Sequence, residues 1–522
     1  MTLACGHRTL ASLWRTRVEL SGDRPFLIFD DLDGGIQRFT YGAFDTLIAR
    51  TAGVLGGLGI RQGDRINLHL ENSVEFLSLW FAAARIGAVI MPTNTASTAH
   101  ELAYLVEHSG SRLIFTQAPH LPAVEQVAEG CECVERIVIC GAAGSGHASL
   151  EELLEKTRPP EEESVIEPTD DAAILYTSGT TAKPKGVEVT HANYIYAGET
   201  VAKAIRLAPG DRHLTVLPLF HGNAQYYSTM SALVAGASMV LCPRFSAGRY
   251  FDTAIRHGCT VASLFAAPIR MILAQPRDPA AARNRLRVLI YAQSITPGQE
   301  REWTKRFNAP LLQIWGMTET MGPPLMNPVD YERRNQSTGL PVMGYEVALM
   351  TEDGHFIDGA DESGEIVVRG LPGWSLMKGY YRNPEATAGT LRENWLHSGD
   401  NARRDGDGYF FFVDRVKDMI KRSGENVAAT EVESVVMQHP AVFECAVIGV
   451  PDEIRDEKIK AVVVLESGAR ATESELRSWC AERLAKFRVP ELIEFRDNLP
   501  RTSVGKIQKH ILRREHQERQ QG

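Results

Sequence analysis

Hydroxyl side chains, glycine and two lysines gather in the segment "LYTSGTTAKPKGV", residues 175–187. Anionic oxygens are bound by this mixture of backbone amides, hydroxyl groups and positive charge. The segment is not a Walker A loop, because G-x-x-x-x-G-K-[ST] cannot be matched in it. It predicts a phosphate-binding loop, and the structural alternative is a turn that joins two strands. The residues that carry this prediction are Thr177, Ser178, Gly179, Thr180, Thr181, Lys183 and Lys185.

The segment "QIWGMTET" places an aromatic ring and a carboxylate a few residues apart. The face of Trp315 can stack on a nucleobase, and the carboxylate of Glu319 can hold a divalent cation that bridges phosphates. Taken alone, the same residues also fit a strand end with a buried tryptophan. The segment therefore supports a nucleotide site only in combination with others.

Three later segments contain groups suited to ribose or phosphate. In "NWLHSGD", Asp400 can accept ribose hydroxyls, or it can bond to its own turn. In "VDRVKDMIKRSGENV", Arg415 either grips ribose or phosphate or belongs to a solvated run of charge. In "LPRTSVGKIQK", Lys506 follows a glycine in the tail and can act as a mobile cation.

The elements that must position these groups follow a regular pattern. Strand-like runs alternate with helical patterns, as in "RINLHL", "SVEFLSLWFAAARIGA", "VIMPTN" and a helix from about Ala99. This alternation predicts an α/β fold built from parallel βαβ units. From about Gly344, short strands broken by turn residues predict a compact antiparallel region.

After Arg415 the pattern predicts a separate α+β domain of roughly 100 residues. Helices are expected at "AATEVESVVMQH" and "TESELRSWCAERLA", and strands at "FECAVIGV", "KIKAVVVLE" and "ELIEFRD". The polar tail "SVGKIQKHILRREHQERQQG" predicts a frayed helix on the surface. The glycine-rich "GAAGSG" lacks the third glycine of a dinucleotide fingerprint and predicts an ordinary turn.

Length and composition narrow the classes of protein. With 522 residues and 44% hydrophobic content, the chain is too long for one core and predicts at least two domains. A net charge of -9 argues against nucleic-acid binding and favours a small-molecule partner. We find neither a signal-peptide pattern nor an apolar stretch of the about 20 residues that span a bilayer. The eight cysteines have no metal-binding spacing, so we expect reduced thiols in a cytoplasmic protein.

Taken in order along the chain, these segments resemble the ANL superfamily of adenylate-forming enzymes. "YTSGTTAKPKGV" is similar to the family's phosphate loop, "LPLFH" to its substrate-gate motif and "WGMTE" to its adenine and magnesium motif. "HSGD" resembles the ribose motif, "DRVKDMIKRSGENV" the hinge motif and "PRTSVGKI" the catalytic-lysine motif. Within the family, "GLPGWSLMKGYYRNPEATA" and "MIKRSGENVAATEVE" are most similar to carnitine and crotonobetaine CoA ligases.

The resemblance implies a ligase reaction in two halves. A carboxylate attacks the α-phosphate of ATP to give an acyl-AMP and pyrophosphate, and the thiol of coenzyme A then displaces AMP. It also implies a large N-terminal domain, residues 1–414, made of βαβ subdomains and a distorted β-barrel region. A small mobile α+β domain, residues 415–522, would rotate between the two halves about a hinge near Lys417.

The resemblance further implies roles for individual residues. Lys506 would neutralise the carboxylate and the α-phosphate, Glu319 would hold Mg²⁺, and His221 would be the gate through which the thiol enters. The expected nucleotide-binding residues are Thr177, Ser178, Gly179, Thr180, Thr181, Lys185, Ala292, Gln293, Trp315, Gly316, Met317, Thr318, Asp400 and Arg415. The expected substrate-binding residues are Asn223, Gln225 and Tyr226, and the expected CoA-binding residues are Ser423, Gly424 and Glu425.

Two departures from the family pattern leave an alternative open. Ala182 stands where the family has glycine, and Ala292, Gln293 and Ser294 replace a glycine-containing pair on which ATP would lie. If residue 182 needs a positive φ, its methyl group costs about 1–2 kcal/mol, which slows adenylation without abolishing it. The alternative is a protein with weak or lost adenylation that transfers a supplied acyl-AMP to CoA. A non-catalytic adenylate-binding protein is a third hypothesis.

The acid itself is predicted only by class. Tyr226 and Tyr227 add bulk, while Asn223 and Gln225 add polar contacts, to the segment "LFHGNAQYYSTM". We expect a medium-sized to bulky carboxylic acid, from a natural-product pathway. A zwitterion such as carnitine is not expected, because no acidic residue is visible to pair with its ammonium. We also expect that the chain can form a homodimer.

Overall fold

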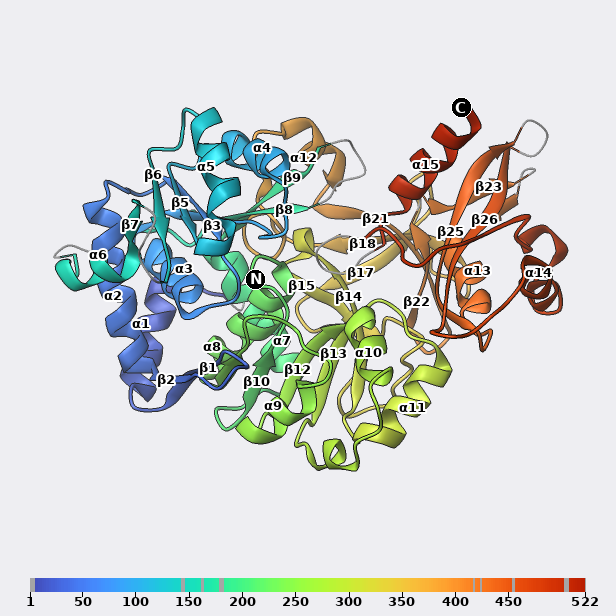
Figure 1. Ribbon diagram of the computed structural model, residues 1–522, viewed down its shortest axis with the longest axis horizontal. Helices are drawn as coiled ribbons and strands as arrows, with labels where there is room; N and C mark the ends of the chain where they lie inside the picture. The colour runs from blue at the N-terminus through green and yellow to red at the C-terminus, as the bar shows by residue number, and fades with distance from the viewer. Residues whose placement is uncertain are drawn as a thin grey trace.

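The computed structural model in Figure 1 describes residues 5–141, 146–160, 164–177, 183–415, 418–422, 425–452, 456–501 and 507–521. Only the backbone is described for Arg415, Glu425, Asn426, Gln520 and Gln521. The described strands form four sheets, two large and two small. The predicted mixture of βαβ units, an antiparallel region and a C-terminal α+β unit is confirmed.

The first large sheet has eight strands in the order β19-β9-β8-β4-β3-β5-β6-β7. Its strands are β3 (Arg65–His69), β4 (Val89–Pro92), β5 (Leu113–Thr116), β6 (Arg136–Ile139), β7 (Ala148–Ser149), β8 (Asp171–Thr177), β9 (Lys185–Thr190) and β19 (Gly379–Tyr380). The helices of this part are α2 (Tyr41–Gly57), α3 (Val74–Ile86), α4 (Ala99–Ser109), α5 (Leu121–Gly130) and α6 (Leu150–Lys156). Helix α3 shows why the helices could be predicted from the sequence, because it has a signal at each end. Ser73 caps its first turn, and Gly87 ends it with a φ of 73°.

The second large sheet has nine strands in the order β16-β15-β14-β13-β12-β10-β11-β1-β2. Its strands are β1 (Pro25–Asp30), β2 (Ile36–Thr40), β10 (Arg212–Thr215), β11 (Ser238–Leu241), β12 (Val261–Phe265), β13 (Val288–Ala292), β14 (Leu311–Met317), β15 (Gly322–Met326) and β16 (Leu340–Pro341). Helices α9 (Tyr250–His257), α10 (Ala266–Leu273) and α11 (Pro297–Phe307) lie between its strands in sequence. Strands β10 to β14 are paired in parallel, as the βαβ alternation predicts.

A group of helices connects the two large sheets through one continuous apolar core. It consists of α1 (Leu10–Ser21), α7 (His191–Ala204), a π-helix η2 (Asn223–Met230) and α8 (Ser231–Ala235). The sequence did not predict the π-helix, a rare form that occurs often at functional sites. Gly198 allows α7 to approach it closely, because a Cβ there would lie 2.6 Å from the carbonyl oxygen of Met230.

The antiparallel region predicted from Gly344 is also present. It is a five-stranded sheet made of β17 (Glu346–Met350), β18 (Ser363–Arg369), β20 (Leu391–Arg392), β21 (Trp395–Arg404) and β22 (Phe410–Arg415). Helix α12 (Pro384–Thr390) precedes β20. Figure 1 shows this sheet between the two large sheets and the C-terminal unit.

The C-terminal unit has its own sheet and its own apolar cores, and it lies at the right of Figure 1. Its strands are β23 (Ile420–Arg422), β24 (Glu425–Val427), β25 (Val442–Asp452), β26 (Asp456–Leu465) and β27 (Leu492–Phe495). Its helices are α13 (Ala429–Val436), α14 (Glu473–Ala481) and α15 (Lys509–Gln521). The boundary expected after residue 414 falls one residue before the end of β22, and β23 of the C-terminal sheet begins at Ile420.

The tail is better ordered than the sequence predicts. Instead of a frayed surface helix, α15 packs on β25 and buries Leu512, which is 1% exposed. Lys509 begins the helix, and its Nζ lies 2.8 Å from Oε1 of Glu433 in α13. Further ion pairs join Arg513 to Asp418, Glu515 to Arg496 and Arg519 to Glu494, so the polar residues of the tail themselves hold the helix.

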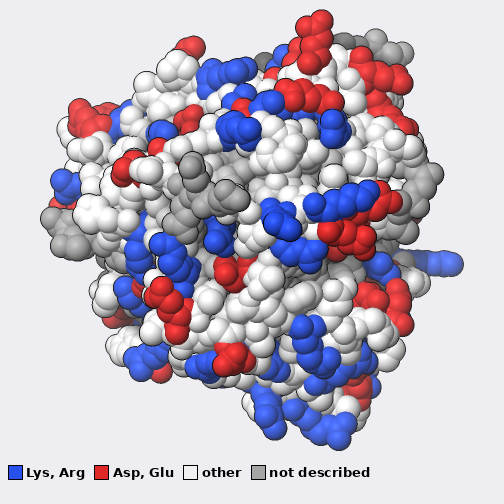
Figure 2. All heavy atoms as spheres, turned by 90° about the vertical axis from the view of Figure 1, so that its left-hand side faces the viewer, with Lys and Arg blue, Asp and Glu red and all other residues white. Residues whose placement is uncertain are grey.

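On the face shown in Figure 2, basic and acidic side chains are interspersed, and neither sign covers the face. The eight cysteines are all unpaired, as predicted. Among the described residues, we find no helix with the length and apolarity needed to cross a membrane.

The close approach of α7 to η2 gives a test of stability. We expect Gly198→Ala to lower the free energy of unfolding by about 1–3 kcal/mol, because the added methyl group meets the backbone of Met230. Thermal denaturation followed by circular dichroism measures the effect. The matched control is Gly56→Ala in α2, where a Cβ meets nothing within 4 Å and where alanine should be neutral or stabilising. Equal melting temperatures for the two variants would contradict the packing described here.

Candidate functional site

The carboxyl ends of β12, β13 and β14 meet at one edge of the nine-stranded sheet. Phe265 pairs with Ala292, and Ala292 pairs with Ile314, so the three strands end side by side. In parallel α/β sheets, ligands bind outside this edge. Beyond β14 the chain forms the short helix η4 (Thr318–Thr320), which carries Glu319 to the same edge.

A hydrogen bond joins two of the predicted residues across two sheets. Nε1 of Trp315 donates to Oδ2 of Asp400 over 2.9 Å. Both side chains are buried, at 7% and 6% exposure, and the Trp315 ring belongs to the main apolar core. The contact brings the "WGMTE" and "HSGD" segments together although they are 85 residues apart. Adenine stacking on Trp315 stays a prediction, and the structure adds that the indole orients the carboxylate.

Asp400 also lies opposite a second predicted residue. In the antiparallel pairing of β21 with β22, the Cα partner of Asp400 is Arg415. The backbone of Arg415 is therefore beside Asp400, at the end of β22.

Glu319 is connected to the predicted phosphate loop through a tyrosine. The hydroxyl of Tyr380 donates to Oε1 of Glu319 over 2.9 Å, and Glu319 is 5% exposed. On the other side, Nζ of Lys185 lies 4.2 Å from the centroid of the Tyr380 ring. Burial and the neighbouring Glu319 both raise the pKa of Tyr380, so the phenol stays protonated and remains a donor.

The sequence predictions did not include Tyr380 among the site residues. It lies in "MKGYYRNPEATA", which indicated the family but gave no position in space. Strand β19 pairs with β9, with Tyr380 opposite Val187, and this pairing places the ring beside Lys185 and Glu319. A tyrosine in a short strand gives no signal for such a contact in a single sequence.

The predicted phosphate loop is a connection between two paired strands. Thr177 ends β8 and is the Cα partner of Lys185, which begins β9. The loop residues Ser178, Gly179, Thr180, Thr181 and Ala182 lie outside the described residues. Nζ of Lys183, just after them, is 5.1 Å from the centroid of the Tyr104 ring.

Residue 316 is glycine because the surrounding atoms leave no room for a side chain. A Cβ on Gly316 would lie 2.6 Å from the carbonyl oxygen of Gly322 and 2.9 Å from the hydroxyl of Tyr227. The turn that follows is tight, because Met317 N donates to Oγ1 of Thr320 over 2.9 Å. The carbonyl oxygen of Thr318 accepts a long hydrogen bond of 3.5 Å from Tyr226.

Gln293 has the backbone conformation that the family pattern leads us to expect of glycine. Its φ is 72°, directly after Ala292 ends β13. A non-glycine residue in the left-handed region costs about 1–2 kcal/mol. The chain therefore keeps the glycine-like turn and accepts a side chain there.

His221 and Asn223 are held together by the start of the π-helix. The backbone N–H of Asn223 donates to Nδ1 of His221 over 3.2 Å, so the neutral imidazole carries its proton on Nε2. The His221 ring packs edge-on against Phe265, with centroids 5.6 Å apart. His221 thus lies beside the end of β12, next to the strand ends that define the site.

The predicted substrate-binding residues differ in their bonding. Gln225 is fully buried, donates from Nε2 to the carbonyl oxygen of Leu219 over 2.6 Å, and accepts from the Tyr194 hydroxyl over 2.5 Å. Tyr226 is 1% exposed and packs against Tyr194. Asn223 is 3% exposed and keeps its Nδ2 without a partner among the described residues.

Several predictions fall on parts of the chain that the structure does not describe. Lys506, Lys417, Ser423 and Gly424 lie outside the described residues. Beside them, the cation Arg422 is 8% exposed and bonds to Glu491 and to the carbonyl oxygen of Phe487. Arg422 is therefore part of the C-terminal unit's own packing, and the alternative of a solvated charge run is wrong for it.

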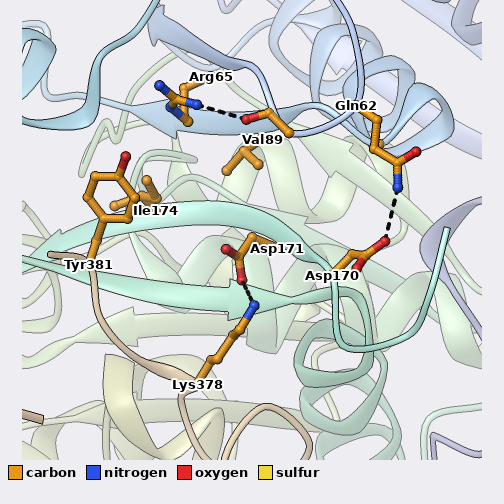
Figure 3. Close-up of a pocket in the computed structure, with 10 residues that line it drawn as sticks. Gln62, Arg65, Val89, Asp170, Asp171, Ile174, Lys378 and Tyr381 are labelled. Carbon is orange, nitrogen blue, oxygen red and sulfur yellow. Dashed lines mark hydrogen bonds and ion pairs between the residues drawn. The ribbon is translucent and has the colours of Figure 1, made fainter. Parts of the chain in front are cut away.

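A pocket elsewhere in the molecule is separate from this site. Figure 3 shows it at the amino ends of β3, β4 and β8, beside Lys378 and Tyr381. Its polar groups are engaged with one another: Lys378 pairs with Asp171 over 2.9 Å, and Gln62 donates to Asp170 over 3.2 Å. We assign it no part in the chemistry.

Comparison with known proteins gives matches over nearly the whole chain. The model of the AMP-binding enzyme family matches residues 14–381, and the model of the AMP-binding enzyme C-terminal domain matches residues 431–506. A crotonobetaine/carnitine–CoA ligase of Salmonella paratyphi A is 37% identical over 514 residues, which are 97% of this chain and 99% of the relative.

Solved structures agree with this. The anthranilate CoA ligase AuaEII, in complex with anthranoyl-AMP, is similar with a TM-score of 0.92 and 26% identity, over 99% of this chain and 98% of that one. ATP-bound MatB from Rhodopseudomonas palustris is similar with a TM-score of 0.88 and 28% identity, over 98% of this chain and 99% of that one.

The bond between Tyr380 and Glu319 can be tested by stability. We expect Tyr380→Phe to destabilise the protein by about 1–3 kcal/mol, because it leaves a buried carboxylate oxygen without its donor. The control is Tyr250→Phe, since the buried Tyr250 hydroxyl has no partner among the described residues and its loss should be neutral or stabilising. Thermal or urea denaturation of both variants gives the comparison. A Tyr380→Phe protein as stable as Tyr250→Phe would show that the hydrogen bond does not hold Glu319.

Proposed function

The chain belongs to the AMP-binding enzyme family and is an AMP-forming acid–CoA ligase, and we propose that it activates its acid where Lys185, Glu319, Trp315 and Asp400 converge. One observation carries the proposal. Residues from four separate segments are joined by the bond from Trp315 to Asp400 and by Tyr380 between Lys185 and Glu319. This arrangement supplies cationic, carboxylate and aromatic groups at one sheet edge, as ATP requires.

In the first half-reaction, the acid's carboxylate attacks the α-phosphate of ATP and pyrophosphate leaves. We assign Asp400 and Arg415 to the ribose, and Trp315 to the adenine and to the orientation of Asp400. Lys185 and the residues from Thr177 to Thr181 hold the phosphates. Lys506 neutralises the charge that develops between carboxylate and phosphate.

Magnesium fits the donor set around Glu319. Among the described residues, we find no group of three or more His, Cys, Asp or Glu side chains placed to enclose a metal ion. Mg²⁺ on a nucleotide needs no such cage, because phosphates and water supply most of its ligands beside one or two carboxylates. We assign Glu319 to this ion, which would screen the phosphate charge when bound. Tyr380 holds the carboxylate in place for it.

In the second half-reaction, the CoA thiol displaces AMP from the acyl-AMP. We assign His221 to the gate, because its ring lies between the start of η2 and Phe265, beside the end of β12. Ser423, Gly424 and Glu425 approach with CoA. The C-terminal unit, with its separate cores, turns as one body about Lys417.

The backbone conformation of Gln293 is relevant to which of the two half-reactions, adenylation or thioester formation, is faster. A side chain in a glycine-like turn narrows the space for the purine, and Ala182 adds a second departure in the phosphate loop. A ligase with slow adenylation and fast transfer from acyl-AMP is the second candidate. It predicts thioester formation from preformed acyl-AMP at a rate well above that from acid and ATP.

Pyrophosphate exchange tests the proposed function directly. We expect acid-dependent exchange of labelled pyrophosphate into ATP, and a loss of about 100- to 1,000-fold in Lys506→Ala, because the cation stabilises charge in the transition state. The paired measurement is CoA thioester formation from preformed acyl-AMP, which Lys506→Ala should largely keep. Exchange that is equal in wild type and variant would refute the role of Lys506. Thioester formed only from acyl-AMP would favour the second candidate.

The indole N–H of Trp315 can be removed while the aromatic ring stays. We expect Trp315→Phe to lower kcat/KM for ATP by about 10- to 100-fold, because a hydrogen bond to a charged carboxylate is lost and Asp400 is no longer oriented. The defect should be smaller with deoxyribose analogues of ATP, which contact Asp400 less.

The control for this substitution is Trp479→Phe in α14. It removes an indole hydrogen bond of 3.0 Å to the carbonyl oxygen of Val435, inside the C-terminal unit. A Trp315→Phe enzyme with equal losses on ATP and on its deoxy analogues would contradict an action through Asp400.

A further inference from the structure

One buried side chain of the site has a hydrogen-bond donor for which the described residues supply no acceptor. Nδ2 of Asn223 is without a hydrogen-bond partner in the described parts of the chain, and the residue is 3% exposed. The other end of the amide is held, since Oγ of Ser263 donates to Oδ1 over 2.7 Å. With the amide in this orientation, its N–H groups face away from Ser263. Buried donors in native proteins almost always have partners, so this one points to a ligand or a water molecule.

The surroundings of Asn223 favour a ligand. Ser263 is in β12, and Thr215 and Ser263 follow the cross-strand pair Leu214 and Ala262, which puts them on the same face of the sheet. The Thr215 hydroxyl is likewise buried and without a partner among the described residues. Both strands reach the carboxyl edge here, and His221 is two residues before Asn223. Two unsatisfied polar groups thus lie between η2 and the sheet, next to the proposed gate.

The charges around Asn223 favour an acid with a neutral acyl part over an acid that carries a cation. The relative quoted above is named for crotonobetaine and carnitine, whose quaternary ammonium has no hydrogen-bond acceptor on it. Strands β10, β12 and β13 and the helix η2 contain no aspartate or glutamate that could pair with such a cation. The N–H groups of Asn223 would present their positive ends to it. A neutral oxygen or nitrogen with a lone pair fits them instead.

We propose that the acid activated by this enzyme carries a neutral hydrogen-bond acceptor in its acyl part, a carbonyl, ether or ring nitrogen, and that Asn223 selects it. Ser263 is the positioning residue that turns the amide toward the substrate. The inference rests on the proposed function, because only a bound acid brings the acceptor to this place.

Matched pairs of acids test the proposal. Levulinate differs from valerate by a ketone, and nicotinate differs from benzoate by a ring nitrogen. We expect kcat/KM for CoA thioester formation to favour the acceptor-bearing member by about tenfold or more in at least one pair. Carnitine and crotonobetaine, tested beside them, should be poorer substrates than that member.

Two substitutions separate the donor from the rest of the site. Asn223→Leu removes the donor at similar volume and should bring the ratio within the pair to about one. Asn223→Asp keeps an acceptor for Ser263 but replaces the donor by a carboxylate, so it should disfavour the acceptor and improve the cationic acids. Asn67→Ala in β3 is the control, since Asn67 also has a buried unpartnered amide atom but lies in the other large sheet. It should leave the ratio unchanged.

The ratio within a pair does not depend on how much of each preparation is folded, so a destabilised variant still gives a result. Ratios that stay the same in both Asn223 variants, with only a lower melting temperature, would mean that the amide serves a buried water molecule, and the proposal would be wrong. A wild-type enzyme that prefers crotonobetaine would also overturn it. Absence of pyrophosphate exchange with every acid would instead refute the adenylation step of the proposed function, while leaving the comparison of acyl-AMP pairs in the thioester-forming step open to measurement.

Discussion

The hydrogen bond between Trp315 and Asp400 is the contact on which the arrangement of the site depends most. It joins the end of β14 in the nine-stranded sheet to β21 in the five-stranded sheet, at a point buried from solvent. The bond from Tyr380 to Glu319 adds the eight-stranded sheet, because β19 is its edge strand. Two hydrogen bonds therefore bring three sheets to one place. Each uses a carboxylate, for which burial without a donor would be costly.

We propose that the same carboxylates take part in the chemistry, and the fold supplies their hydrogen-bond donors from large rings. Tryptophan and tyrosine each bring one polar atom on a rigid apolar body, so they can reach a buried carboxylate without adding further unsatisfied groups. The ring of Tyr380 serves a second purpose, since its face lies under Lys185. One residue therefore contacts both the cation and the carboxylate.

Sequence reasoning predicted residues that we assign to the nucleotide, but it did not predict Tyr380, which holds one of them. The segments around Trp315, Glu319 and Asp400 contain unusual combinations of residue types, and their order along the chain indicated the family. Tyr380 could not be found in this way, because its role comes from the pairing of β19 with β9. The π-helix was equally hidden, since "NAQYYSTM" has no periodicity that distinguishes it from an α-helix. The prediction of a frayed tail was wrong because the tail is mostly polar. Its composition gave no sign that α15 packs through the buried Leu512 and through ion pairs such as that to Glu433.

The described part of the tail is attached to the C-terminal unit at two places. Arg501 and Ile507 face each other as an antiparallel bridge, Arg501 pairs with Glu444 in β25, and α15 packs on the same strand. The described residues on both sides of 502–506 therefore belong to one packed unit. If Lys506 acts as we propose, its effective concentration at the nucleotide would follow the angle of that whole unit, and a rotation of the unit would end its part in adenylation.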